Sequence, residues 1–356
     1  MSSTRRVFRI VSARPKPPDI GCKLTDGVAV HSSGDEEAAP VTASTGAAFR
    51  RGWRESATPG KDKRGIVMTA PVDFVFWPAS ARAHGFRGHV EAARAGGFTA
   101  LAIAPETYLD ALESGLTPSD MKAMAADVGA PLRYLDSLTD WAPIRVPAEC
   151  SPELRARFDV STDHSFRMCE KLGLTSILAV AGYDKGTVEL SRLIDGFGRL
   201  CERAKAQGYW IDLEFMPFWG MPNLSDAWAI VSGVNPSNAG ILVDVWHFSK
   251  GAYELDLLKS LPARHLAGMQ IDDGVRRQVG NSLFDDTINY RNFPGEGEFD
   301  VVEIIKIVAG KGNLRHVGPE VFSLEADALS ATEAGERSGD TSRKVLAEAG
   351  VRLATA

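Results

Sequence analysis

The stretch ILVDVWHF, residues 241–248, combines an apolar run with a carboxylate in its middle. Apolar residues flank Asp244 on both sides, and His247 follows three positions later. A short bounded run of this kind is typical of a buried strand. Burial of a carboxylate is unfavourable unless the group is hydrogen-bonded, paired with a cation or bound to a metal. The stretch therefore predicts a strand that ends at a polar site.

Similar apolar runs alternate with amphipathic segments from residue 70 onward. This alternation indicates parallel strands joined by right-handed crossovers. Eight such units fit a (β/α)₈ TIM barrel, an α/β fold that usually spans about 250 residues. An open doubly wound sheet is the alternative, but FWPASARAHGF (76–86) lacks the glycine-rich phosphate loop that it needs after its first strand. The predicted strands cover residues 73–77, 99–104, 132–136, 176–182, 210–216, 240–246, 267–272 and 316–322.

Several of the predicted helices carry start and stop signals. A capping box or a proline in the first turn marks a helix start, and a glycine before the next strand marks a helix end. The predicted starts are Thr117 with Asp120, Ser151 before Pro152, and Asp300 with Glu303, and the predicted ends are Gly173 and Gly208. The connection from Asp272 to Phe299 is long enough for a binding loop, with room for a helical turn.

Composition places the chain among globular proteins without a membrane span. Of its 356 residues, 44% are apolar and 24% are charged. No run approaches the roughly 18 apolar residues of a membrane helix. The four cysteines, Cys22, Cys150, Cys169 and Cys201, form no CxxC pair. This spacing fits neither a disulfide framework nor a thiolate metal site, and it predicts a reducing, cytoplasmic location.

Residues 1–66 differ from the rest of the chain. They are rich in Ser, Gly, Pro, Ala and Arg and show no sustained periodicity, which predicts a disordered N-terminal extension before a barrel domain at 67–356. The basic opening MSSTRRVFRIVSARPKPP is weakly similar to a transit peptide. We favour an extension upstream of the natural start, because structured sequence begins at once with MTAPVDFVFWP from Met68.

Charge excludes nucleic acid as the expected partner. Residues 1–65 hold 12 Lys+Arg against 7 Asp+Glu, whereas the remainder holds 28 against 39. Nucleic-acid binding depends on basic side chains that neutralise phosphates, so an acidic body disfavours it. A small molecule held near a cation is the expected ligand, and the oligomeric state, including a homo-oligomer, stays open.

Polar residues interrupt four consecutive predicted strands. Glu214, Asp244, Gln270 and Glu320 each lie near the end of an apolar strand. Catalytic groups of TIM barrels lie at these strand ends, and neighbouring ends are adjacent in a closed barrel. Three carboxylates that meet there repel one another unless a cation lies between them. A single acid in a strand is usually structural, but four in succession predict a divalent metal site.

The motifs around these residues resemble the xylose isomerase-like TIM barrels, and most of all their sugar phosphate isomerase/epimerase branch. The resemblance covers about residues 70–350 and is strongest over 209–323. It rests on IDLEF (211–215), LVDVWHF (242–248), GMQIDD (268–273), RNFPGEGEFD (291–300) and GPEVFS (318–323).

The resemblance implies roles for individual side chains. Glu214, Asp244 and Glu320 would bind the metal, with the two glutamates also acting as the catalytic acid/base pair. His247 would hydrogen-bond the substrate. Many related epimerases have histidine where this chain has Gln270. An amide oxygen favours Mn²⁺ or Mg²⁺ over Zn²⁺ or Co²⁺, which remain the alternatives.

Two arginines and two tryptophans are further candidates for substrate binding. The resemblance implies that Arg276, after the seventh strand, contacts substrate oxygens, and Arg291 is a second candidate; either could equally be a solvated loop residue. Trp77 and Trp219 follow strand ends, where aromatic rings stack on sugars or an aglycone. Their alternative role is packing in the core.

The chemistry implied is proton abstraction next to a carbonyl through a metal-stabilised enediolate. An isomerase or epimerase acting on a sugar, polyol or related keto compound is the leading hypothesis. The alternative is a lyase or dehydratase on the same scaffold, of the keto-inositol dehydratase or 3-keto glycoside and C-glycoside cleaving type. A non-catalytic sugar-binding module is less favoured because a binder needs no opposed glutamates. Abasic-site endonucleases of the superfamily need a histidine-rich three-metal cluster and a basic face, so they rank last.

Overall fold

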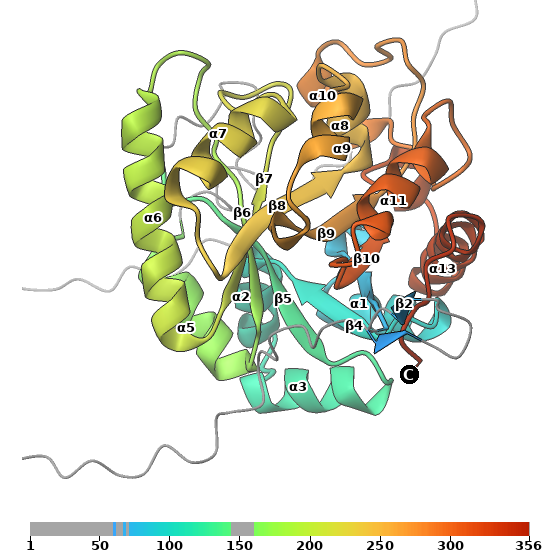
Figure 1. Ribbon diagram of the computed structural model, residues 1–356. Coiled ribbons are helices and arrows are strands. Elements are labelled where there is room, and N and C mark those ends of the chain that lie inside the picture. The colour runs from blue at the N-terminus through green and yellow to red at the C-terminus, as the bar shows by residue number, and fades with distance from the viewer. Residues whose placement is uncertain (1–59, 62–66, 69–70, 144–159, 356) are drawn as a thin grey trace, which may run out of the picture. The chain divides into compact units, whose positions relative to one another are not determined.

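The computed structural model describes residues 60–61, 67–68, 71–143 and 160–355. Eight parallel strands close into a barrel in the order β10-β3-β4-β5-β6-β7-β8-β9, so the predicted TIM barrel is confirmed (Figure 1). The strands are β3 (Asp73–Phe76), β4 (Ala100–Ile103), β5 (Leu132–Leu138), β6 (Ser176–Ala179), β7 (Trp210–Glu214), β8 (Ala239–Asp244), β9 (Leu266–Ile271) and β10 (His316–Pro319). Because β10 ends at Pro319, Glu320 lies just beyond its strand.

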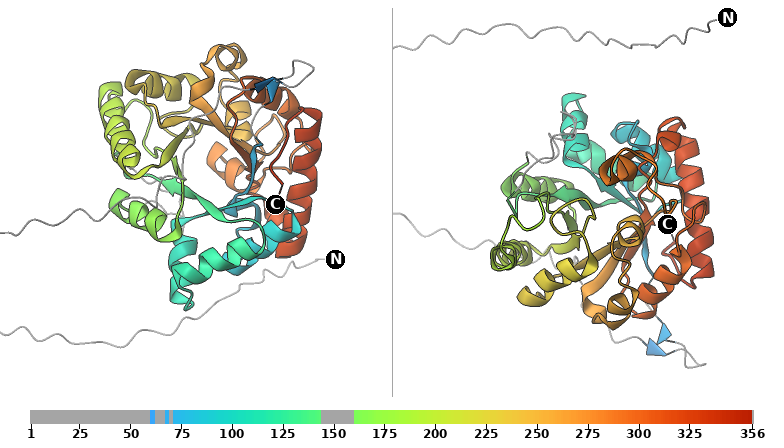
Figure 2. Two further views of the ribbon diagram at one scale, coloured as in Figure 1. Left: turned by 60° about the horizontal axis from the view of Figure 1, so that its bottom comes forward. Right: turned by 90° about the horizontal axis from the view of Figure 1, so that it is seen from above.

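Helices surround these strands, as the two views of Figure 2 show. The helices are α1 (Phe86–Ala95), α2 (Pro105–Glu113), α3 (Pro118–Asp127), α5 (Thr162–Leu172), α6 (Leu190–Gln207), α7 (Leu224–Val234), α8 (Val245–Lys250), α9 (Leu255–Ser260), α10 (Leu283–Asn289), α11 (Val301–Gly310), α12 (Leu324–Asp327) and α13 (Ala331–Glu348), with short 3₁₀ segments η1 (Pro78–Ala81) and η2 (Ala263–His265). The helix α10 lies within the long connection after β9, as expected.

Alternating strand residues face two separate apolar clusters. Phe74, Ile241 and Val243 belong to a cluster that joins the outer strand faces to the helices. Val75 and Leu242 belong to a smaller cluster of the alternate residues. Successive side chains of a strand point to opposite faces, so the smaller cluster fills the barrel interior. Asp244 is two residues after Leu242 and therefore faces the same interior.

The helix boundaries confirm most of the local signals. Thr117 and Asp120 form the predicted capping box of α3. Gly173 and Gly208 end α5 and α6 in left-handed conformations with φ of +71° and +80°. At such angles glycine avoids the steric strain of a Cβ atom. The start predicted at Ser151 lies outside the described residues.

One predicted cap is wrong. Asp300 precedes α11, but its side chain makes no capping hydrogen bond. Its carboxylate instead accepts hydrogen bonds from the Tyr253 hydroxyl at 2.8 Å and the Arg276 guanidinium at 2.9 Å. Partners from distant parts of the chain outcompete the backbone amides of the helix for this carboxylate.

The predicted N-terminal extension, residues 1–66, lies outside the described residues except at Gly60–Lys61. This dipeptide pairs in an antiparallel ladder with Val67–Met68, and the two form β1 and β2. In the described part of the chain, no helix is both long and apolar enough to cross a membrane.

Closure of the barrel between β10 and β3 depends on Gly318. A Cβ atom at this position would lie 1.8 Å from the Val75 carbonyl oxygen, which is backbone and has little freedom to move. We expect Gly318→Ala to lower the free energy of unfolding by about 3 kcal/mol, measured by urea denaturation. The control is Gly310→Ala at the end of α11, where an added Cβ meets nothing within 4 Å. Equal stability of the two variants would contradict this account of barrel closure.

Candidate active site

Four polar side chains meet at the carboxyl ends of β7 to β10. Glu214 is the last residue of β7 and Asp244 the last of β8. Gln270 in β9 is in register with Asp244 on one side and with Gly318 on the other, two residues before Glu320. Strand register therefore brings the four predicted metal ligands together at the end of the barrel where TIM-barrel active sites lie.

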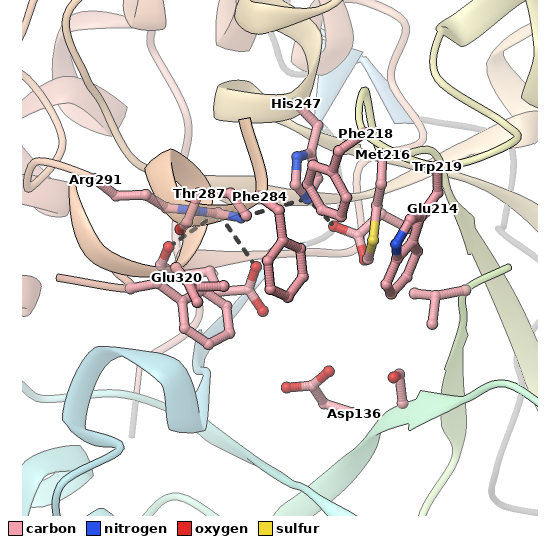
Figure 3. Close-up of a pocket in the computed structure, with 14 residues that line it drawn as sticks. Asp136, Glu214, Met216, Phe218, Trp219, His247, Phe284, Thr287, Arg291 and Glu320 are labelled. Carbon is pink, nitrogen blue, oxygen red and sulfur yellow. Dashed lines mark hydrogen bonds and ion pairs between the residues drawn. The ribbon is translucent and has the colours of Figure 1, made fainter. Parts of the chain in front are cut away.

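A pocket opens at this end of the barrel and has a polar and an apolar part (Figure 3). Glu214 and Glu320 approach it from different sides. The other polar residues of the lining are Asp136, Ser137, His247, Thr287 and Arg291, and the apolar ones are Val180, Met216, Phe218, Trp219, Phe284, Ile288 and Phe322. A mostly apolar cavity with a few convergent polar groups is typical of a small-molecule site.

Ligand atoms of Glu214, Asp244 and His247 lie within 4.8 Å of one another, so these buried residues could hold a metal ion. One Asp244 oxygen caps α8 by accepting a hydrogen bond from the His247 backbone amide at 2.6 Å. Among the described residues, Oε1 of Glu214 has no hydrogen-bond partner, and it lies 3.5 Å from Nε2 of His247. A buried carboxylate oxygen without a partner is costly, and a bound cation would satisfy it.

Gln270 and Glu320 form the other side of the cluster. The Gln270 amide donates a hydrogen bond to Oε1 of Glu320 at 2.8 Å, and Oε1 of Gln270 has no hydrogen-bond partner in the part of the chain that the structure describes. The cluster therefore offers carboxylate and amide oxygens together with one imidazole. This donor set fits a divalent metal ion.

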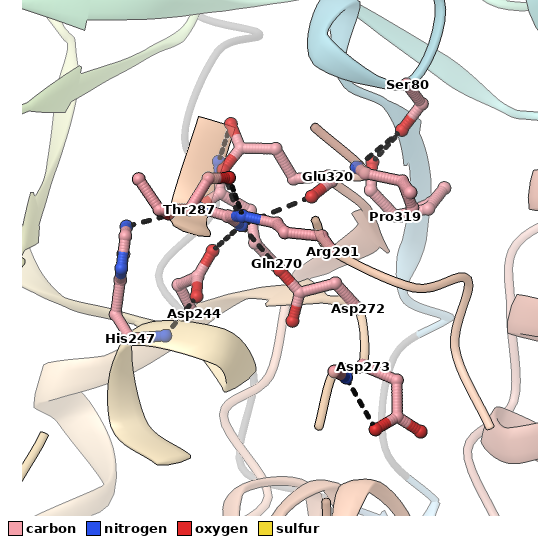
Figure 4. A network of polar contacts seen from close by, with 12 residues as sticks. Ser80, Asp244, His247, Gln270, Asp272, Asp273, Thr287, Arg291, Pro319 and Glu320 are labelled. Atoms are coloured by element: carbon pink, nitrogen blue, oxygen red, sulfur yellow. Dashed lines mark hydrogen bonds and ion pairs between the residues drawn. The ribbon is translucent and has the colours of Figure 1, made fainter. Parts of the chain in front are cut away.

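Arg291 lies among these acids, fully buried (Figure 4). Its Nη1 donates to Asp244 at 2.7 Å, to Asp272 at 2.5 Å and to the side chain of Glu320 at 3.3 Å. Its Nη2 lies 3.3 Å from Nε2 of His247. The guanidinium is thus the positive charge that the three carboxylates share.

Burial, neighbouring charges and hydrogen bonds shift the pKa values of the acids in different directions. Burial, followed by the charges of Glu320 and Asp244, raises the pKa of Glu214 well above its usual range. Burial also raises the pKa of Asp272. Burial opposes ionisation of Asp244 as well, but the charge of Arg291 and the hydrogen bonds from its guanidinium and from the His247 backbone amide outweigh it and lower the pKa. The cluster therefore contains one firmly ionised carboxylate beside others that hold protons more readily.

His247 is neutral at physiological pH. Burial lowers its pKa to about 3, because desolvation disfavours the imidazolium more than the Asp244 charge favours it. A neutral imidazole can hydrogen-bond a substrate oxygen or bind a metal. Both the predicted substrate contact and a ligand role suit this environment.

The structure separates the four remaining substrate-contact candidates. Trp219 and Arg291 line the pocket. Trp77 is buried in the barrel interior beside Tyr134 and His316, and it is not a lining residue. Arg276 is half exposed and forms an ion pair with Asp300, also outside the lining. The positions of Trp77 and Arg276 do not support the predicted contacts, and all site roles stay predictions.

Sequence reasoning missed four polar members of the site. Asp272 shares Arg291, Thr287 binds the same guanidinium, and Asp136 and Ser137 near the end of β5 line the pocket. The sequence contained a signal for Asp272: it is two residues after Gln270, and in an extended chain two such residues point to the same side. Thr287 had none, since its position depends on how the loop folds.

Comparisons with known sequences support an enzyme family. A family model described as xylose isomerase-like TIM barrel matches residues 90–343. The chain is 24% identical over 237 residues to a 3-dehydroshikimate dehydratase of Pseudomonas aeruginosa, which is 66% of this chain and 36% of that protein. It is 28% identical over 151 residues to an inosose isomerase of Halalkalibacterium halodurans, which is 42% of this chain and 52% of that protein. The matches thus span about half or less of these relatives.

Solved structures show the same fold. The IOLI protein with a zinc atom matches with a TM-score of 0.66 at 20% identity, covering 78% of this chain and 99% of that one. D-allulose 3-epimerase from Methylomonas sp. in complex with D-allulose matches with a TM-score of 0.56 at 15% identity, covering 81% and 99%. At these identities the likeness concerns the barrel alone.

Removal of one charge should distinguish a metal site from a purely structural cluster. We expect Asp244→Asn to bind Mn²⁺ at least about tenfold more weakly than the native protein, because an amide can still cap α8 but lacks the anionic ligand. The matched control is Asp286→Asn, which removes a buried aspartate that pairs with Lys250 at 2.7 Å outside the pocket. Equal Mn²⁺ affinity of the native protein and Asp244→Asn in equilibrium dialysis would contradict the metal assignment.

Proposed function

Because this chain belongs to the xylose isomerase-like TIM barrel family, we propose that it removes a proton next to the carbonyl of a small keto polyol. A proton is then returned to the opposite face of the same carbon, as in an epimerase, or to the former carbonyl carbon, as in an isomerase. The supporting observation is the pair of glutamates, Glu214 and Glu320, that enter one pocket from different strands. A substrate between them would present a different face to each carboxylate.

The environment of Glu214 suits a proton carrier. Its pKa is raised by burial and by neighbouring acids, and a carboxylate with a raised pKa is a stronger base toward a substrate C–H bond. Glu214 would remove the proton and Glu320 would supply one on the other face. Return to the same carbon gives the epimer, and return to the former carbonyl carbon gives the isomer.

Glu214, Asp244 and Glu320 would hold a divalent ion, with Gln270 and His247 as the neutral candidates for completing its shell. When bound, the ion would act as a Lewis acid that polarises the substrate carbonyl and so acidifies the neighbouring C–H bond. The oxygen-rich donor set supports Mn²⁺ or Mg²⁺ over Zn²⁺. Neutral His247 would hydrogen-bond a substrate hydroxyl if it does not bind the ion.

The pocket lining supports an unphosphorylated substrate with an apolar face. Among the described lining residues, Arg291 is the only Lys or Arg, and carboxylates already surround it. A phosphate group would find no available cation in this lining. Phe218 and Trp219 pack edge to face with ring centroids 5.2 Å apart, and they offer an aromatic wall to a sugar or cyclitol ring.

Dehydration is the second candidate function, favoured by the longer match to the 3-dehydroshikimate dehydratase. The same two glutamates can perform it. Glu214 would take the proton beside the carbonyl, the electron pair of that C–H bond would form a C=C bond, and the hydroxyl on the next carbon would leave as water with a proton from Glu320. The fate of the substrate after proton loss therefore decides between isomerase and dehydratase.

Deuterium incorporation tests the proposed function. The metal-supplemented protein would be incubated in D₂O with a panel of inososes, ketoses, 3-keto glycosides and 3-dehydroshikimate, and NMR would follow each substrate. Deuterium beside the carbonyl with an inverted centre or a moved carbonyl means epimerase or isomerase, and loss of water or an aglycone means lyase. No exchange with any panel member would contradict the proposal.

We expect Glu214→Gln and Glu320→Gln each to lower turnover at least about 100-fold, because an amide cannot carry the proton. The matched control is Glu254→Gln outside the pocket, where the Glu254 carboxylate accepts a hydrogen bond from the Ser225 backbone amide at 2.8 Å and an amide oxygen can replace it. Native turnover in both active-site variants would refute this acid/base assignment.

A further inference from the structure

Arg291 contacts the same oxygens that a divalent ion would need. Its Nη1 bonds Oδ2 of Asp244 at 2.7 Å and reaches Oε2 of Glu320 at 3.3 Å. Oδ1 of Asp244 already accepts a hydrogen bond from the His247 amide, so Oδ2 is the more accessible oxygen for a metal. The guanidinium and the ion would therefore both bind Oδ2 of Asp244. Two cations bound to the same oxygen repel each other.

The guanidinium is firmly anchored in this position. Its Nε donates to the Thr287 carbonyl at 3.0 Å and its Nη2 to the Thr287 hydroxyl at 2.9 Å. Its central carbon lies 5.5 Å from the centroid of the Trp246 ring and 5.2 Å from that of Phe322. Figure 4 shows the acids and Thr287 gathered around it.

Asp272 gives the arginine a second place to bond. It bonds Nη1 at 2.5 Å, is fully buried, and is not among the predicted metal ligands or the pocket lining. A guanidinium that left Asp244 and Glu320 could stay paired with Asp272. The two states would differ in which cation neutralises Asp244 and Glu320.

We infer that Arg291 is an internal competitor of the divalent ion at the active site. This inference rests on the metal site of the proposed function and adds a residue that sets its affinity. Without an ion, Arg291 neutralises the acids and keeps the site folded, since carboxylates buried without a counter-charge are strongly destabilising. Binding of the ion requires Arg291 to give up Asp244 and Glu320, so the native site binds its metal more weakly than its ligands alone would.

Metal affinity measures this competition directly. Mn²⁺ would be titrated into metal-stripped native protein and Arg291→Met, with free Mn²⁺ followed by electron paramagnetic resonance. We expect the variant to bind Mn²⁺ at least about tenfold more tightly, because no cation must be displaced. The apo variant should melt at a lower temperature than the native apo protein, and saturating Mn²⁺ should restore its melting temperature.

Two controls locate the effect. Arg337→Met removes another bridging arginine, which bonds Glu296 and Glu325 at 2.6 Å each away from the pocket, and it should leave the Mn²⁺ affinity unchanged. Addition of Asp244→Asn to Arg291→Met should abolish the gain in affinity. A gain that survives this second change would place the binding elsewhere and overturn the inference.

Thr287→Val provides a second test of the competition if Arg291→Met does not fold. It removes the hydroxyl that anchors Nη2 but keeps the similar side-chain shape and the carbonyl that accepts from Nε. Since the competing position of Arg291 becomes less stable, Mn²⁺ should bind about threefold or more tightly. Native or weaker affinity in this variant would then overturn the inference.

The outcomes separate this inference from the proposed function. Mn²⁺ binding in the native protein with equal affinity in Arg291→Met contradicts the competition alone. Absence of Mn²⁺ binding in both proteins contradicts the metal site itself and the competition with it. Tighter binding in Arg291→Met supports both.

Discussion

The buried acids at the ends of β7 to β10 require positive charge among them, and the rest of the site follows from this requirement. Glu214, Asp244 and Glu320 are buried away from water, and like charges repel more strongly in the protein interior than in water. Among the described residues, Arg291 supplies this charge, and it is the one guanidinium in the pocket lining. The opposed pKa shifts of Asp244 and Glu214 follow from which acid lies nearest that charge.

The packing of the barrel holds this unfavourable cluster of acids in place. Asp244 shares the inner face with Leu242, and the apolar cluster beneath it keeps the strands in register. Gly318 lets β10 approach the backbone of β3 closely enough for closure, which places Glu320 beside Gln270. Rigid strand ends thus hold groups that would otherwise separate, which is the arrangement that precise proton transfer needs.

The polar side of the pocket bears on the type of reaction, and the apolar side bears on the choice of substrate. The polar side supports proton removal beside a carbonyl and is compatible with isomerisation, epimerisation or dehydration, since all three share that first step. The apolar side, with Phe218, Trp219 and Phe284, would select the proposed substrate by shape and lies largely on segments that follow strands. Family membership therefore constrains the chemistry more than it constrains the substrate.

The sequence by itself determined the barrel and the residues at its strand ends. Alternating runs specify strands and helices through local periodicity, and an acid such as Asp244 within an apolar run is visible without a fold. Only the tertiary structure decided the partners. It placed Arg291 among the acids, Arg276 on the surface with Asp300, and Trp77 in the interior. Each of these contacts joins segments far apart in the chain, and the direction of a long side chain on a loop depends on how that loop packs, which no local pattern encodes.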